Sequence, residues 1–175
     1  MRPALPWIRI LSLSLALGPL AFGAEPPKGG DAPGSTFKAK VSGAQSFEAD
    51  GDGPRSAGGR RKRTGSEAGE RQVVQLRTDL SDGRFELVLS VDVTGKAPDA
   101  EVGVHTLHPL DAVGQWSRSG TDTEFYSEKG TLEVKESNTA HLRGTFDVSG
   151  KCGKRREACR IEGQFDVRRE NPTTY

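Results

Sequence analysis

RFELVLSVDV, residues Arg84–Val93, is the most regular segment of the chain. Every second residue from Phe85 to Val93 is apolar, and the residues between them are polar except for Val88. Alternation with a period of two is typical of a β-strand that has one face on a hydrophobic core and the other face in water. We therefore expect a half-buried antiparallel strand here.

The residues before this strand complete a hairpin. Val74, Leu76 and Leu80 share one face of a second alternating segment. Ser-Asp-Gly at 81–83 then has the composition of a tight turn. The sequence therefore predicts that 72–80 and 84–93 are the two strands of a β-hairpin.

Shorter alternating segments continue toward the C-terminus, and turn-forming residues recur between them about every ten positions. No stretch has the periodicity of an amphipathic helix. The sequence predicts an all-β fold of about eight strands, and it leaves open an antiparallel β-sandwich or a small meander barrel. The remaining expected strands are 36–41, 102–107, the segments around Trp116 and around Phe125 and Tyr126, 130–135, 142–148 and 160–167.

The N-terminus has the layout of a secretory signal peptide. Arg2 and Arg9 form a positive region, and the apolar run Ile10–Leu20 is too short to span a membrane comfortably. Small residues follow, so we expect cleavage after Gly23 or Ala24. Residues 1–23 are thus interpreted as a signal peptide, and the protein as secreted or periplasmic.

The rest of the chain is predicted to be one domain with two irregular segments. Residues 24–35 are rich in Pro and Gly, which favours a flexible lead-in. Residues 36–175 are interpreted as a single β domain. Within it, 48–70 contains many Gly and charged residues but no large apolar residue, so we expect a mobile loop.

The overall charge favours no particular class of partner. The chain has a formal net charge of +1, and loss of Arg2 and Arg9 with the signal peptide leaves −1. A near-neutral protein has no general attraction to nucleic acids or membranes. We therefore expect no specific nucleic-acid partner, and we look for electrostatic contacts only in local clusters.

Four segments, in order, carry a resemblance. They are GVHTL at 103–107, the aromatic pair Phe125 and Tyr126, GTLEV at 130–134 and GTFDV at 144–148. The series resembles small exported bacterial β-proteins of uncharacterised function, which often carry Gly-x-Tyr-x-Leu, Gly-Thr-Leu and Gly-Thr-Phe strands and are often lipid-anchored. His105 departs from the pattern, because an aromatic residue is usual there. The resemblance implies an all-β fold and implies no activity.

The two cysteines of the chain lie in KCGKRREAC, Lys151–Cys159. A zinc site needs four ligands, commonly in closely spaced pairs, and a thioredoxin-like redox pair needs Cys-x-x-Cys at a helix start. This segment has neither pattern. In an exported chain, two cysteines at the base of a hairpin loop indicate a structural disulfide, so we expect a Cys152–Cys159 bond.

That bond would hold a cationic loop. Lys154, Arg155 and Arg156 lie between the cysteines and are the candidate binding residues, for an anionic glycan, a lipid headgroup or an acidic protein surface. RRKR at 60–63 is a second cluster, in the expected mobile loop. The alternative is that both clusters are simply solvated, and in a eukaryotic host RRKR would also suit a processing protease.

No catalytic or metal-binding pattern is evident. His105 and His108 point to opposite faces of an extended strand, so we expect no shared metal and no cofactor. No Gly-x-Ser-x-Gly elbow frames a serine. No spacing selects a catalytic pair among the outward-facing carboxylates, which are Asp92, Glu133, Asp147, Glu162 and Asp166.

We therefore expect a non-enzymatic, exported β domain that binds a partner or belongs to the cell envelope. Two alternatives stay open. One is a small secreted hydrolase with an unrecognised carboxylate site. The other is a barrel that holds a small apolar ligand against Trp116, Phe125 and Tyr126, although packing in the core is the favoured interpretation of these aromatic residues.

Overall fold

The structure is a computed structural model, which describes residues 34–52, 55–63, 69–93 and 101–169. For 61–63 and 69 it describes the backbone alone. The predicted signal peptide and residues 24–33 of the lead-in lie outside the described residues. Ser35, at the end of the expected lead-in, belongs to the domain, because its buried hydroxyl accepts a hydrogen bond of 2.9 Å from the backbone N–H of Arg168.

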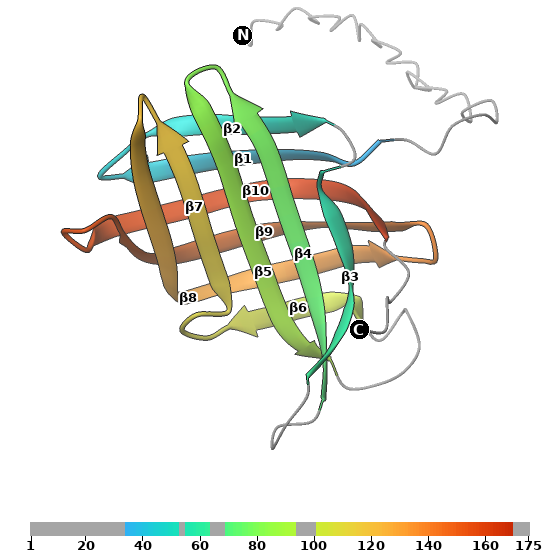
Figure 1. Ribbon diagram of the computed structural model, residues 1–175. Coiled ribbons are helices and arrows are strands. Elements are labelled where there is room, and N and C mark those ends of the chain that lie inside the picture. The colour runs from blue at the N-terminus through green and yellow to red at the C-terminus, as the bar shows by residue number, and fades with distance from the viewer. Residues whose placement is uncertain (1–33, 53–54, 64–68, 94–100, 170–175) are drawn as a thin grey trace, which may run out of the picture. The chain divides into compact units, whose positions relative to one another are not determined.

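The described residues form β-strands and no helix, which confirms the all-β fold class (Figure 1). All of these strands belong to the compact unit Ala32–Tyr175. The strands are β1 (Thr36–Gly43), β2 (Phe47–Asp52), β3 (Ala57–Arg63), β4 (Gly69–Leu80), β5 (Gly83–Val93), β6 (Gly103–Leu107), β7 (Ala112–Arg118), β8 (Thr121–Ser137), β9 (His141–Cys152) and β10 (Glu157–Arg169).

Seven strands close into a ring in the order β10, β3, β4, β5, β7, β8, β9 and back to β10. Strand pairs in the ring are antiparallel except where β10 meets β3, at Arg168 opposite Ala57 and Arg169 opposite Gly58. β1 and β2 extend from β10, and β6 pairs with β8. Figure 1 shows β4, β5 and β7 running across the direction of β1, β9 and β10, so two layers of strands cross around one core.

The long strand β8 joins the two layers. Its first part pairs with β7 and its second part pairs with β6, while β9 follows it along the other side. The register with β9 shifts between Ser127 and Lys129, as expected at a β-bulge. A bulge bends a strand, which lets β8 turn from one layer into the other. The sequence segments around Phe125 and around Leu132 are therefore one bent strand.

The predicted hairpin and its buried face are confirmed. β4 and β5 pair along their whole length, from Glu70 opposite Val93 to Leu80 opposite Gly83. The five alternating apolar side chains of β5 are all buried. The first four, Phe85 to Val91, belong to one core cluster with Trp116, Phe125 and Phe165, which are also among the largest fully buried side chains.

Phenylalanine rings cover glycines that lie directly opposite them on neighbouring strands. A Cβ added to Gly163 would lie 2.7 Å from the Cζ of Phe146, and one added to Gly144 would lie 2.8 Å from the Cζ of Phe165. Each ring occupies the space that a side chain on the facing residue would need. The three facing pairs are Phe37 and Gly51, Phe146 and Gly163, and Phe165 and Gly144.

The prediction of a mobile loop at 48–70 is wrong for most of that range, because it contains β2, β3 and the start of β4. After Phe47, which packs against the core, the inward residues of β2 and β3 are small. Ala49 is fully buried, and a Cβ on Gly58 would lie 2.8 Å from Cδ2 of Leu142. Large side chains on neighbouring strands fill the space, so β2 and β3 carry no alternating pattern of large apolar residues. Residues 53–54 and 64–68 lie outside the described part of the chain.

Candidate functional site

The predicted disulfide joins the ends of β9 and β10. Cys152 and Cys159 are bonded, with their Cα atoms 5.9 Å apart. Cys152 lies opposite Glu157, and Cys159 lies opposite Gly150, so the bond runs diagonally across the hairpin. Both cysteines are buried in the core. The bond therefore fixes the base of the loop to the packed interior.

The loop itself, Gly153–Arg156, is a tight turn, and we call it the hairpin tip. The N–H of Arg156 donates to the carbonyl of Gly153 at 3.1 Å, and the N–H of Gly153 donates to the carbonyl of Glu124 in β8 at 2.9 Å. Gly153 and Arg156 have φ angles of 69° and 54°. Glycine adopts this region freely, whereas for arginine it costs about 1–2 kcal/mol. The tip thus has one backbone conformation, and this conformation is unfavourable for Arg156.

The three predicted binding residues, Lys154, Arg155 and Arg156, are exposed at this tip. The guanidinium carbon of Arg156 lies 5.8 Å from the centre of the Tyr126 ring, which is within the range of a cation–π contact. The hydroxyl of Tyr126 donates to Glu124 at 2.9 Å, and this hydrogen bond raises the pKa of Tyr126.

The tip differs from most of the other described arginine positions in its lack of carboxylate partners. Within the described residues, no carboxylate pairs with Lys154, Arg155 or Arg156, and four cations against Glu157 give 151–157 a net charge of +3. Arg84 and Arg168 also lack a carboxylate partner there, but neither belongs to a run of three exposed cations. Carboxylates pair with Arg55, Arg60, Arg71, Arg77, Arg118, Arg143, Arg160 and Arg169.

The second predicted cluster, RRKR at 60–63, lies in β3 and not in a loop. Arg60 pairs with Glu70 at 3.1 Å and also with Glu101, whose side chain is fully buried. The side chains of 61–63 lie outside the described part. Arg60 therefore belongs to an internal charge cluster and does not form an exposed patch with the hairpin tip.

Glu101 is the centre of that cluster, and no sequence pattern singled it out. Arg169 donates to it at 2.6 Å and Ser137 at 2.8 Å, in addition to the contact with Arg60. Burial alone raises the pKa of Glu101, but the hydrogen bonds from Arg169, Arg60 and Ser137 outweigh burial, so its pKa is lowered. The carboxylate is charged and fully partnered, which suits a structural role.

The histidines do not form a metal site in the described part of the chain. His105 lies 2.7 Å from the carbonyl of Glu101, His108 is exposed, and His141 lies 3.1 Å from Asp166. Over the described residues, no group of three or more His, Cys, Asp or Glu side chains is arranged to hold a metal ion.

A groove of about 630 Å³ crosses the outer face of β1, β2, β9 and β10. Asp50, Asp52 and Asp166 line it, so it is where a pair of catalytic carboxylates could be sought. Asp166 is already bound by Arg143 at 2.7 Å and by His141. A catalytic acid needs a raised pKa. The described carboxyl groups with a clear shift, Asp82, Glu86, Glu101 and Asp147, all have lowered pKa values.

The aromatic residues considered for an apolar ligand separate into two groups. Trp116 and Phe125 are fully buried in the core, while Tyr126 is 36% exposed on the outer face. They do not line a common cleft.

No helix in the described ranges is long and apolar enough to cross a membrane.

Comparisons with protein-family models, with curated proteins and with solved structures find no match for this chain. The class of protein is therefore described from the fold and the surface of this chain. It is an all-β domain with a closed ring of strands and a cationic hairpin tip that is closed by a disulfide.

Proposed function

We propose that this protein is an exported, non-enzymatic β domain that binds an anionic partner through Lys154, Arg155 and Arg156. One observation carries the proposal. These three adjacent cations are exposed and lack carboxylate partners in the described residues, whereas most described arginines are ion-paired. Adjacent like charges repel one another, so an external anion is the partner that would relieve this repulsion.

The shape of the tip supports the same function. The disulfide at its base and the hydrogen bond from Gly153 to Glu124 hold it before any partner arrives. A preformed loop loses less conformational entropy on binding than a flexible one. The positive φ of Arg156 is an unfavourable conformation of the kind that persists at ligand-binding sites.

Export is part of the proposal. The disulfide suits an oxidising compartment, which agrees with the signal peptide expected from residues 1–23. We therefore place the protein outside the cytoplasm, as a secreted or periplasmic component. The resemblance to small exported bacterial β-proteins is consistent with this location and adds no activity.

The test is chromatography on two columns, one with immobilised heparin and one with immobilised poly-glutamate. The wild-type protein should be retained and should elute as salt increases, because salt screens exposed charges. Replacement of Lys154, Arg155 and Arg156 by alanine should abolish retention. The matched control replaces Lys38, Lys40 and Arg84, three exposed cations from other strands, and loses the same charge.

The control triple variant should elute at nearly the wild-type salt concentration, and circular dichroism should show that both variants fold. Equal losses in the two triple variants would show that only overall charge matters. Full retention of the tip variant would show that the hairpin tip is merely solvated. Either result would refute the proposed role of the tip.

A further inference from the structure

The outer face beside the hairpin tip carries an apolar row. Val88 of β5 lies opposite Val113 of β7, and Val113 lies opposite Tyr126 of β8. Val113 and Tyr126 are each 36% exposed. The row explains the single apolar exception on the polar side of β5, because Val88 belongs to it. Arg156 of the tip lies over the ring of Tyr126, so the row ends at the cationic tip.

A second unusual residue lies next to this row. Residues His108–Asp111 form a turn in which the N–H of Asp111 donates to the carbonyl of His108 at 3.0 Å. Leu110 has a φ of 71° in this turn, and 63% of it is exposed. A bulky non-glycine residue rarely adopts this region, and an exposed leucine gains nothing from the core. Leu110 is therefore unfavourable for folding in two ways.

The Leu110 turn is held rigidly. The carboxylate of Asp111 accepts a hydrogen bond of 2.7 Å from the N–H of His108, and it also pairs with Arg71. The N–H of Leu110 donates to the carbonyl of Ser127 at 3.1 Å. The leucine side chain is thus presented to solvent from a fixed turn.

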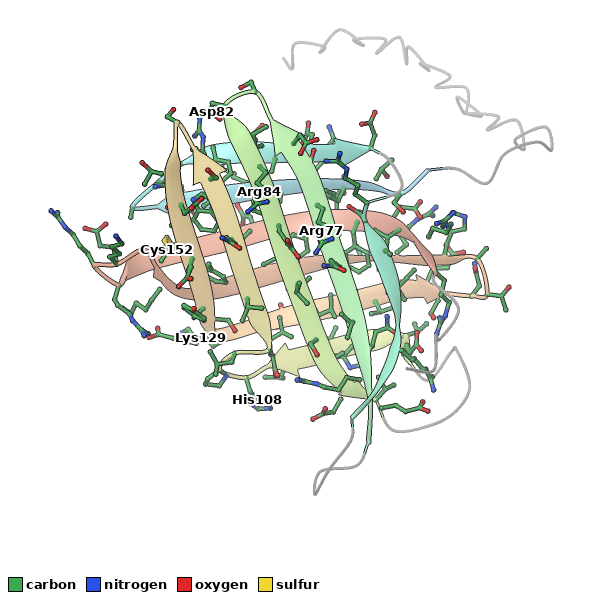
Figure 2. The ribbon with its side chains drawn as sticks, in the orientation of Figure 1. Arg77, Asp82, Arg84, His108, Lys129 and Cys152 are labelled. Atoms are coloured by element: carbon green, nitrogen blue, oxygen red, sulfur yellow. A yellow bond between two sulfur atoms is a disulfide. The ribbon has the colours of Figure 1, made fainter. Side chains whose placement is uncertain are left out.

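The turn and the hairpin tip meet on one segment of β8. Arg156 contacts the ring of Tyr126, and the N–H of Leu110 donates a hydrogen bond to the carbonyl of the next residue, Ser127. Figure 2 shows Cys152, Lys129 and His108 along the same side of the domain in this view. Exposed apolar side chains and cations without a carboxylate partner are therefore placed against the same segment of β8. We call Leu110, Val113, Tyr126 and the hairpin tip the docking surface.

Acidic residues border this surface and limit its charge. Apart from Asp111 of the Leu110 turn, which pairs with Arg71, five cations against three carboxylates leave a net charge of +2. One of the carboxylates, that of Glu124, is engaged by the hydroxyl of Tyr126. The charged residues are Lys129, Lys151, Lys154, Arg155 and Arg156, with Glu124, Glu128 and Glu157.

We propose that the docking surface binds the surface of an anionic phospholipid bilayer. The cations would contact the headgroups, while Leu110 and the ring of Tyr126 would enter the interfacial layer, where leucine and tyrosine side chains are favourable. The inference rests on the proposed anion binding and names the partner. A bilayer suits these residues better than a peptide, for which a groove would be the natural site. Leu110 and the tip stand on turns, whereas the groove lies on the outer face of β1, β2, β9 and β10.

The experiment measures vesicle co-sedimentation of the protein as the cell produces it, with its N-terminal residue determined and identical in every variant. The probes are phosphatidylcholine vesicles and vesicles in which about a third of the lipid is phosphatidylglycerol. Binding should require phosphatidylglycerol. Alanine at Lys154, Arg155 and Arg156 should weaken it about a hundredfold, because each basic residue near an anionic membrane strengthens binding about fivefold.

Leu110→Gly is the decisive variant. Glycine suits the positive φ at this position, so the variant should fold at least as well as the wild type. Loss of the leucine side chain should weaken vesicle binding about tenfold. Retention on heparin and poly-glutamate should not change, because the charge of the tip is intact. The variant with alanine at Lys38, Lys40 and Arg84 is again the charge control.

The outcomes test bilayer binding separately from anion binding by the hairpin tip, on which it rests. Tip-dependent retention on heparin or poly-glutamate without vesicle binding would refute the bilayer and leave anion binding in place. Poly-glutamate as the stronger ligand would point instead to an acidic protein. Vesicle binding that Leu110→Gly leaves unchanged would refute the role of the apolar residues. A wild-type protein that binds none of the probes would refute both proposals.

Discussion

The indole Nε1 of Trp116 donates a hydrogen bond of 2.6 Å to Oε1 of Gln45. Trp116 is fully buried in β7, whereas Gln45 lies in the turn between β1 and β2. The amide nitrogen of Gln45 also donates to Thr123 at 3.2 Å, and Phe47 packs edge-on against the indole. This turn therefore covers the largest side chain of the core and satisfies its only polar atom.

Gln45→Ala should lower the free energy of unfolding by about 1–2 kcal/mol, because the buried indole N–H loses its acceptor. Urea unfolding followed by circular dichroism measures the change. Gln115→Ala in β7 is the control, since this residue lies on the outer face, and it should have little effect. Equal stability of the Gln45 variant and the wild type would show that the bond contributes nothing.

Gly144→Ala should destabilise the domain by about 2–3 kcal/mol, because the new Cβ would overlap the carbonyl of Glu133 and the ring of Phe165. Gly114→Ala is a matched control within β7, since its added Cβ would meet its nearest neighbours at 3.4 Å. Thermal unfolding of both variants checks the prediction. If Gly144→Ala and Gly114→Ala lower the stability by similar amounts, the close contact between the phenylalanine rings and the glycines is not important for stability.

Reduction of the Cys152–Cys159 bond should lower stability by about 2–3 kcal/mol, as expected when a short loop loses its cross-link. Urea unfolding of the same protein with and without dithiothreitol measures the difference. Non-reducing peptide mapping is the direct check on the bond. Free thiols at both positions, or a disulfide-linked dimer, would contradict it.

Glu101→Gln should destabilise the domain at pH 7 by about 3 kcal/mol, because Arg60 and Arg169 would lose a buried counter-charge. The pKa of Glu101 is lowered on folding, so its charge stabilises the folded state above the ordinary carboxyl value of 4.5. This stabilisation is lost as the pH falls through the lowered pKa.

The stability difference between the wild type and Glu101→Gln should therefore shrink as the pH falls below 4.5. Urea unfolding across an acidic pH series measures it. Glu48→Gln, at an exposed position of β2, is the control and should show no such trend. A difference that stays constant with pH would contradict the charged state of Glu101.

Arg156→Gly should have opposite effects on stability and binding. Glycine removes the cost of a positive φ, so the free energy of unfolding should rise by about 0.5–1 kcal/mol. The loss of a cation should lower the salt concentration that elutes the protein from heparin. A variant that is more stable and binds heparin as well as the wild type would show that this arginine does not serve binding.

The closed ring depends on facing residues that are distant in sequence. The ring strand β3, and β2 beside the ring, were missed because their inward residues after Phe47 are small, and side chains of β1 and β9 fill the space. Sequence periodicity reports the size of a residue but not the size of the residue opposite it. The bulge near Ser127 was missed for a similar reason, since it is defined by the register with β9.

The alternation in Arg84–Val93 was enough to predict the hairpin and its buried face, because the period of a strand is a local property of consecutive residues. The two cysteines and the short loop between them were likewise enough to predict the disulfide. The pairing of Arg60 with Glu101, and the hydrogen bond from Leu110 to Ser127, came only from the folded chain. The Arg60–Glu101 contact joins segments that are distant in sequence and needs strand pairing across the ring, whereas the Leu110 contact needs only the pairing of β7 with β8.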